Sequence, residues 1–343
     1  SIDSPKSTKF FKSLVFLVFH LVLLLERPSN IIILHLTEVS IIESTWPENL
    51  LPIQSRIFPN ELSHAKSHCD CNGIVRTIQT AIDRNGYLWL IDNGSKFCAP
   101  KLLIFDLLRG NTEIHRHVFN DLRDASFKGI HLHTFSNKDK TSNLISVDDT
   151  RAIILLQNKQ FLLIYSPLKN GTKKLNFLKS DSIKKEFIVP FEIAMRSNKE
   201  LLICDHFNKL WSADISQDHL SNSCSSQKDD FPVITIPTKY LGSLLGLPKA
   251  LTVSISPDSE SINTFLYYYL PRDGVVVRWN YRQPLTAEGH DILYFAQRPV
   301  KQIIFGVKGS VWIIFEYADE FGDHCRRVLN FLSLNGPRLK KKR

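Results

Sequence analysis

Two closely spaced histidines are the first residues whose spacing suggests chemistry. His131 and His133 are two residues apart, so on a strand their side chains face the same way. A metal site would need a third ligand, and His115 and His117 are near enough in sequence to be considered. The competing interpretation, which we favour, is a polar strand face or loop. We therefore predict no metal site and no cofactor.

No catalytic residue stands out. Asp83, Asp92 and Asp106 follow or precede apolar runs, where aspartates usually accept hydrogen bonds from backbone N–H groups. We expect a structural role for all three. The sequence has no glycine-rich phosphate loop, no G-x-S-x-G and no H-E-x-x-H. Hydrolase, kinase and zinc-protease functions therefore have no support, and the catalytic and ligand-binding residues stay unassigned.

Four tryptophans fall on apolar runs at comparable positions: Trp89, Trp211, Trp279 and Trp312. Packing in the core is the role we expect for most of them. The functional alternative is an amine cation over an aromatic face, which is worth about 0.5–2 kcal/mol.

The elements that must position these residues are short β-strands. Runs rich in Ile, Leu, Val, Phe, Tyr and Trp alternate with polar turns between about residues 74 and 333. No stretch keeps a helical period over three turns. The expected strands cover residues 87–91, 101–107, 152–156, 161–165, 200–204, 210–213, 264–270, 275–279, 303–305 and 310–315. The sequence predicts an all-β chain.

These runs recur along the chain. Comparable strands are centred near residues 88, 154, 202, 267 and 312. The intervals resemble the blades of a β-propeller, which span about 40–50 residues apart from loop insertions. The pattern predicts a propeller of five or six blades.

Composition and charge limit the kinds of molecule that this protein is expected to bind. The 343 residues are 43% hydrophobic and 22% charged, as in ordinary globular proteins. The net charge of +9 comes mostly from lysines and arginines near the two ends, including the basic tail 334–343. Because the rest of the chain is close to neutral, we expect no nucleic-acid partner.

The N-terminal region predicts export. Residues 14–25 form an apolar run behind Lys6, Lys9 and Lys12, which is typical of a signal peptide and short for a membrane span. We predict that residues 1–30 are a signal peptide or signal-anchor, with a buried strand as the alternative. The protein is then secreted, is a monomer, and contacts a membrane only through an uncleaved signal segment.

The cysteines and the glycosylation sequons are also typical of an exported protein. The six cysteines are Cys69, Cys71, Cys98, Cys204, Cys224 and Cys325. An even number in an exported chain suggests disulfides, although spacing leaves their pairing open. Asn93 and Asn170 each begin an N-x-S/T sequon and are predicted glycosylation sites. Asn-Gly-Ser is also a common turn, which makes Asn170 the stronger candidate.

Three blocks in order carry a family resemblance. They are CNGI at 71–74, DRNGYLWLIDNG at 83–94 and CAPKLLIFDL at 98–107. The series resembles the yellow/major royal jelly protein family, whose members carry C-D-G, D-x-x-G-x-L-W-V-L-D-x-G and C-x-P-K-L-φ-φ-F-D-L. Weaker similarity continues at 276–280 and 309–314, so the resemblance spans residues 69–316.

The resemblance implies a secreted six-bladed β-propeller over residues 31–333, with Cys71 bridged to Cys98. The segment before Cys71 is shorter than in the family, which leaves open an incomplete first blade. Family members convert dopachrome, bind biogenic amines or serve as nutritional proteins. We therefore expect a pigmentation-related protein that acts on or binds a small aromatic amine or catechol derivative. The alternative is a structural or nutritional secreted protein without a functional pocket.

Overall fold

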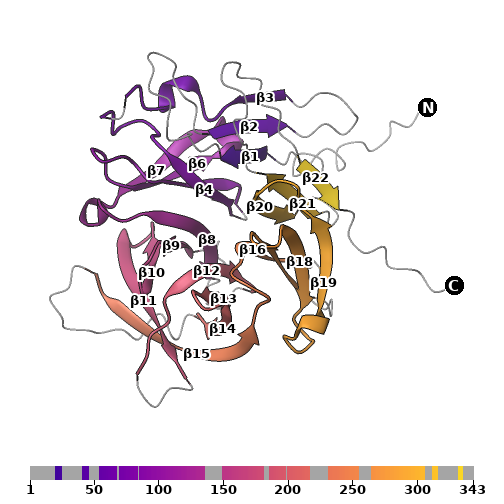
Figure 1. Ribbon diagram of the computed structural model, residues 1–343. Coiled ribbons are helices and arrows are strands. Elements are labelled where there is room, and N and C mark those ends of the chain that lie inside the picture. Colours follow the sequence, from indigo (N-terminus) through magenta and orange to yellow (C-terminus); the bar gives the residue numbers. More distant parts are fainter. Residues whose placement is uncertain are drawn as a thin grey trace, which may run out of the picture. The chain divides into compact units, whose positions relative to one another are not determined.

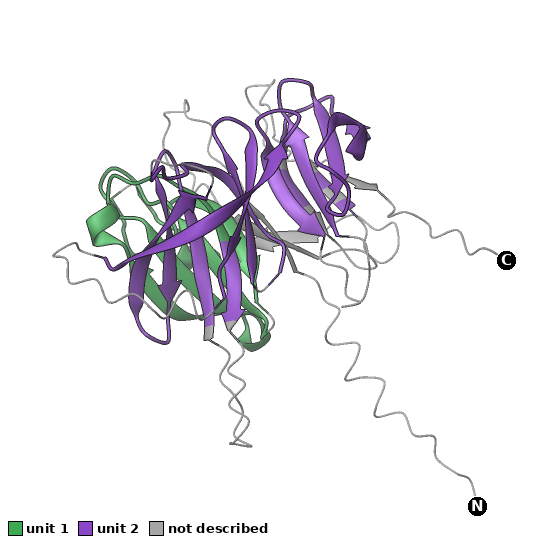
Figure 2. Ribbon diagram, turned by 90° about the horizontal axis from the view of Figure 1, so that it is seen from below, with its two compact units in different colours: residues 1–130 green, residues 131–343 purple. Residues whose placement is uncertain are grey.

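The protein is described by a computed structural model, shown in Figure 1. It describes residues 20–24, 41–45, 54–67, 69–83, 85–135, 149–180, 185–197, 199–216, 231–254, 264–305, 311–315 and 331–334. In these ranges every regular element is a β-strand or a short 3₁₀ turn, so the all-β prediction is confirmed. None of the described helical turns has the length or apolarity of a membrane span. The chain divides into two compact units, residues 1–130 and 131–343 (Figure 2).

Unit 1 contains two antiparallel sheets of consecutive strands. The first sheet is β1 (His20–Leu24), β2 (Ile41–Thr45) and β3 (Gln54–Ile57). The second is β4 (Thr77–Ile82), β5 (Tyr87–Asp92), β6 (Lys101–Asp106) and β7 (Thr112–Val118). Strand β1 lies inside the predicted signal segment 1–30, which stays a prediction. A core of Phe58, Ile74, Leu88, Leu90, Leu103 and Phe105 packs in this unit.

Unit 2 is built mainly from an eight-stranded sheet and a four-stranded sheet. The eight-stranded sheet has the order β12-β13-β14-β15-β11-β10-β9-β8. Its strands are β8 (Phe127–Phe135, which starts in unit 1), β9 (Asp149–Leu156), β10 (Phe161–Ser166), β11 (Gly171–Lys179), β12 (Pro190–Met195), β13 (Glu200–Asp205), β14 (Lys209–Asp214) and β15 (Val233–Ser243). Strands β11 and β15 pair in parallel and so join two runs of four consecutive strands into one sheet.

The remaining strands of unit 2 form two more antiparallel sheets. The four-stranded sheet is β16 (Lys249–Ser254), β17 (Phe265–Leu270), β18 (Val275–Asn280) and β19 (His290–Phe295). The last is β20 (Val300–Phe305), β21 (Val311–Phe315) and β22 (Phe331–Leu334). The first strands of successive groups are neighbours, because β12 contacts β16 and β16 contacts β20 (Figure 1).

Burial on both faces explains the continuous apolar runs of the middle strands. In β13, Leu201 and Ile203 pack in one core, while Leu202 and Cys204 pack in another. Strand β17 likewise divides its side chains between two cores. A strand covered on both faces reads as an unbroken hydrophobic run. Such runs can be recognised from sequence, and all ten predicted strands are present.

The strands that the sequence analysis missed are more polar. In β15, Ile234 and Ile236 are buried, but Thr235 and Pro237, which alternate with them, are exposed. Strand β7 carries exposed or half-buried side chains throughout. Strands with one solvated face show alternation instead of an apolar run, and short alternating segments are difficult to distinguish from loops.

Candidate ligand-binding site

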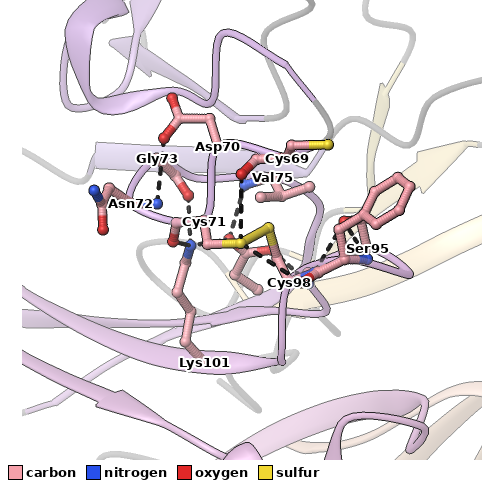
Figure 3. The surroundings of a disulfide bond; sticks show 12 residues. Cys69, Asp70, Cys71, Asn72, Gly73, Val75, Ser95, Cys98 and Lys101 are labelled. Carbon is pink, nitrogen blue, oxygen red and sulfur yellow. Dashed lines mark hydrogen bonds and ion pairs between the residues drawn. A yellow bond between two sulfur atoms is a disulfide. The ribbon is translucent and has the colours of Figure 1, made fainter.

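The disulfide that the resemblance implied is present. Cys71 and Cys98 are bonded across 27 residues of sequence (Figure 3). Cys69 is an exposed thiol, and Cys204 is a buried thiol that donates to the carbonyl of Asp205 at 3.4 Å. Cys224 and Cys325 lie outside the described residues.

A buried ammonium group lies beside the disulfide. The Lys101 side chain is 1% exposed, and its Nζ donates to the carbonyl oxygens of Cys71 at 2.7 Å and Gly73 at 2.5 Å (Figure 3). The same Nζ lies 3.4 Å from Oδ2 of Asp92. Burial lowers the pKa of Lys101, and the negative charge of Asp92 opposes that shift. Three oxygen partners thus compensate the desolvation of this charge.

The carboxylate of Asp92 is also fully hydrogen-bonded, to three backbone N–H groups. Its Oδ2 accepts from the backbone N–H of Val75 at 2.8 Å, and its Oδ1 accepts from those of Arg76 at 2.8 Å and Gly94 at 2.9 Å. The carboxylate is fully buried. Because both members of the ion pair are enclosed and hydrogen-bonded, this region stabilises the fold and presents no exchangeable group to a ligand.

The other aspartates of the motif also bond the backbone. Asp83 Oδ1 accepts from the N–H groups of Asn85 and Tyr87, at 2.9 and 3.0 Å. Asp106 Oδ1 accepts from Leu108 and Arg109 and so caps a 3₁₀ turn. The structural role predicted for Asp83, Asp92 and Asp106 is confirmed.

The tryptophans pack in the core as expected. Trp89, Trp211 and Trp279 are 2%, 4% and 3% exposed. The Trp89 indole donates to Asp83 Oδ2 at 3.0 Å, and the Trp211 indole donates to Asp205 Oδ2 at 3.2 Å. In each pair the aspartate precedes the tryptophan by six residues, so the same Asp–Trp hydrogen bond occurs in both units. The side chain of Trp312 lies outside the described part of the structure.

The histidines do not gather into a metal site. His131 and His133 lie on β8, and His115 and His117 lie on β7. Burial lowers the pKa of His131 to about 4, which keeps it neutral at neutral pH. No group of three or more metal-ligating side chains occurs among the described residues.

The two sequons differ in accessibility. Asn170 is exposed in a turn with φ 43°, and its Oδ1 accepts from Tyr165 at 3.1 Å. Asn93 is 6% exposed, and its Nδ2 lies 3.4 Å from both Ser126 Oγ and the Phe127 carbonyl. Glycosylation stays a prediction at both, but the structure favours Asn170 because the amide nitrogen of Asn93 is enclosed.

One cluster in unit 2 combines charge, an aromatic face and partial exposure. It consists of Arg196, Glu200, Ser212 and Tyr281, and we call it the Glu200 cluster. Glu200 Oε1 accepts from Ser212 Oγ at 2.5 Å and from the Tyr281 hydroxyl at 2.7 Å. Glu200 Oε2 forms an ion pair with Arg196 Nη1. The Arg196 guanidinium carbon lies 3.5 Å from the centre of the Tyr281 ring.

Strand geometry brings these side chains together. Arg196 follows β12 and Glu200 begins β13, and the Arg196 N–H closes this hairpin by donating to the Glu200 carbonyl at 3.0 Å. Ser212 faces Leu202 across β13 and β14, so it lies diagonally opposite Glu200. Tyr281 follows β18 and packs against the core shared by β12–β15 and β16–β19. The cluster therefore lies at the margin of that core.

The Tyr281 hydroxyl keeps its proton at neutral pH. Burial raises the pKa of Tyr281 to about 12, and its hydrogen bond to Glu200 adds to the shift. The phenol is therefore a donor at neutral pH. The side chains of Arg196 and Glu200 are 31% and 20% exposed. A partly desolvated carboxylate beside an aromatic face has the chemistry that recognises an organic ammonium ion.

Sequence reasoning missed this cluster. Arg196 and Glu200 share one hairpin, but Ser212 joins them only through the register of β13 and β14, and Tyr281 only through the packing of two sheets. The one available signal is Glu200, a charged residue at the start of the apolar run that forms β13.

Comparisons with known proteins add no family. No protein-family model matches the sequence, and no curated protein matches it. Among solved structures, 63 chains match.

One is an auxiliary nutrient binding protein from Bacteroides thetaiotaomicron, with a TM-score of 0.44 and 10% identity; the match covers 79% of this chain and 63% of that one. Another is the β-propeller domain of Cps50 (Swd1) from Myceliophteria thermophila, with a TM-score of 0.44 and 13% identity. This match covers 87% of this chain and 92% of that one. A luciferin-regenerating enzyme matches with a TM-score of 0.40 and 9% identity, over 82% of this chain and 80% of that one. At these scores the similarity carries no argument about this chain.

Proposed function

We propose that this chain is a secreted, six-bladed β-propeller of the yellow type that binds a small aromatic amine or catechol derivative. Six groups of consecutive strands support the blade count: β1–β3, β4–β7, β8–β11, β12–β15, β16–β19 and β20–β22. Contacts between the first strands β12, β16 and β20, and middle strands buried on both faces, are features of propeller blades packed side by side. The three sequence blocks at residues 71–107 support the yellow type.

The Glu200 cluster is the observation that carries the binding function. It supplies a carboxylate for an ammonium group, an aromatic face for a cation or a ring, and hydroxyl groups for hydrogen bonds to a catechol. The fully buried ion pair of Lys101 and Asp92 offers none of these to a ligand.

Titration calorimetry with dopamine and serotonin tests the proposal, with dopachrome absorbance followed in parallel. Saturable heat with one-to-one stoichiometry and an unchanged decay of dopachrome is the expected result. Accelerated decay would instead identify an enzyme, which needs a base next to the reacting carbon. A folded sample that shows neither would reject the proposal and leave a structural or nutritional protein.

A further inference from the structure

Arg196 holds the position that a ligand cation would take in the Glu200 cluster. Its guanidinium covers the Tyr281 ring at 3.5 Å and pairs with Glu200 at the same time. An organic ammonium ion uses the same two partners, an aromatic face and a carboxylate. The protein thus supplies its own cation to this position.

We propose that Glu200, Ser212 and Tyr281 form the ammonium-binding site for a primary arylalkylamine such as dopamine, and that Arg196 occupies this site until the amine replaces it. The inference rests on the proposed function and names the site and the competing group. Ser212 and Tyr281 both donate to Oε1, which holds the carboxylate in place whether Arg196 is present or not. The second oxygen, Oε2, is the one that Arg196 and the amine share.

The position of Arg196 allows the exchange. It lies just beyond the end of β12, and its side chain is 31% exposed, so the guanidinium is able to move into water without opening a strand pair. Partly exposed ion pairs are weak, because water screens the two charges. Cation–π attraction at such partly exposed sites is also weak. A competitor of this strength lowers the apparent affinity of an amine without preventing its binding.

The chain offers a matched control in Arg278. Its guanidinium lies 4.9 Å from the centre of the Phe265 ring, and its Nε donates to Asp291 Oδ2 at 2.8 Å. The arrangement repeats that of Arg196, but the Asp291 side chain is 61% exposed, against 20% for Glu200. We expect no amine site there, because water screens a carboxylate that is this exposed.

The test measures dopamine affinity in wild-type protein and in three variants: Arg196→Gln, Glu200→Gln and Arg278→Gln. Removing the competitor in Arg196→Gln should tighten binding about tenfold, which corresponds to an open site populated about one tenth of the time. Glu200→Gln should weaken binding at least tenfold, since the charged acceptor is lost. Arg278→Gln should match wild type. The neutral probe 4-methylcatechol should not respond to Arg196→Gln in the same way, because it has no ammonium group.

The outcomes separate this inference from the proposed function. Dopamine binding that is unchanged in both Arg196→Gln and Glu200→Gln would overturn the site and leave amine binding standing. Weaker binding in Arg196→Gln would make Arg196 a ligand contact and overturn the exchange. No binding to wild type or to folded Arg196→Gln would reject the amine-binding function itself. Circular dichroism and thermal melts establish that each variant is folded.

Discussion

Two charged clusters in this protein each contain an ion pair between a basic and an acidic side chain, but their surroundings differ. Lys101 and Asp92 in unit 1 are almost completely buried, and backbone carbonyl and N–H groups occupy their remaining hydrogen-bonding positions. Arg196 and Glu200 in unit 2 are partly exposed, and the hydroxyl groups of Ser212 and Tyr281 donate to Glu200. Burial with complete pairing makes a charge structural, whereas partial exposure leaves a charge available for exchange.

Breaking the unit 1 pair should have the largest effect. Asp92→Asn keeps the shape of the side chain but leaves Lys101 buried without its counter-ion. We expect a loss of about 3–5 kcal/mol in the free energy of unfolding, as when one partner of a buried ion pair is removed. The measurement is urea unfolding followed by fluorescence.

Glu200→Gln is the control for this comparison. Because the Arg196–Glu200 pair is partly exposed, its loss should cost about 1 kcal/mol or less. Equal losses in Asp92→Asn and Glu200→Gln would contradict the distinction between the two clusters.

Removing the disulfide should have the next largest effect. Cys98→Ser opens a loop with a sequence separation of 27 residues, and a loop of this size is expected to contribute about 3 kcal/mol. Cys69→Ser alters only an exposed thiol and should leave the melting temperature unchanged. A melting temperature that falls equally in both variants would place Cys69 in the disulfide network.

Alkaline pH should weaken unit 2 through its buried phenols. Burial raises the pKa of Tyr165 and of Tyr281 to about 12, and it also raises the pKa of Tyr268. In the unfolded chain a tyrosine titrates near pH 10, so the folded state binds more protons above that pH. The stabilisation is complete below about pH 10 and is lost as the pH rises toward 12.

Thermal melts between pH 8 and pH 11 measure this loss. Tyr281→Phe removes one of the titrating groups and should reduce the dependence on pH. A melting temperature that stays constant from pH 9 to pH 11 would show that these phenols titrate normally.

Glycosylation should have the smallest effect on stability. Glycopeptide mass spectrometry of the protein from a eukaryotic secretory host should find a glycan on Asn170, which is exposed, and not on Asn93, whose amide is enclosed. Enzymatic removal of the glycan should change the free energy of unfolding by less than about 0.5 kcal/mol, as for other surface changes. A glycan found on Asn93 alone would reverse this assignment.

The sequence predicted the middle strands well and the outer strands poorly. Strands β13 and β17 are buried on both faces, and their apolar runs are distinctive without any tertiary information. Strands β7 and β19 carry many exposed side chains, so hydrophobicity alone does not reveal them. The parallel pairing of β11 with β15 could not be predicted, because it depends on how two hairpin groups meet.

The sequence by itself determined the all-β class, the turn aspartates and the blocks at 71–107, since hydrophobic runs and turn residues act locally. Only the tertiary structure placed Tyr281 against Glu200 and Arg196, since Tyr281 lies about eighty residues after them in the sequence. It also decided that Lys101 is enclosed whereas Arg196 is partly open to water. The physical reason is that burial and strand register depend on the packing of whole sheets. The exposure of a charge cannot be determined from its neighbours in sequence.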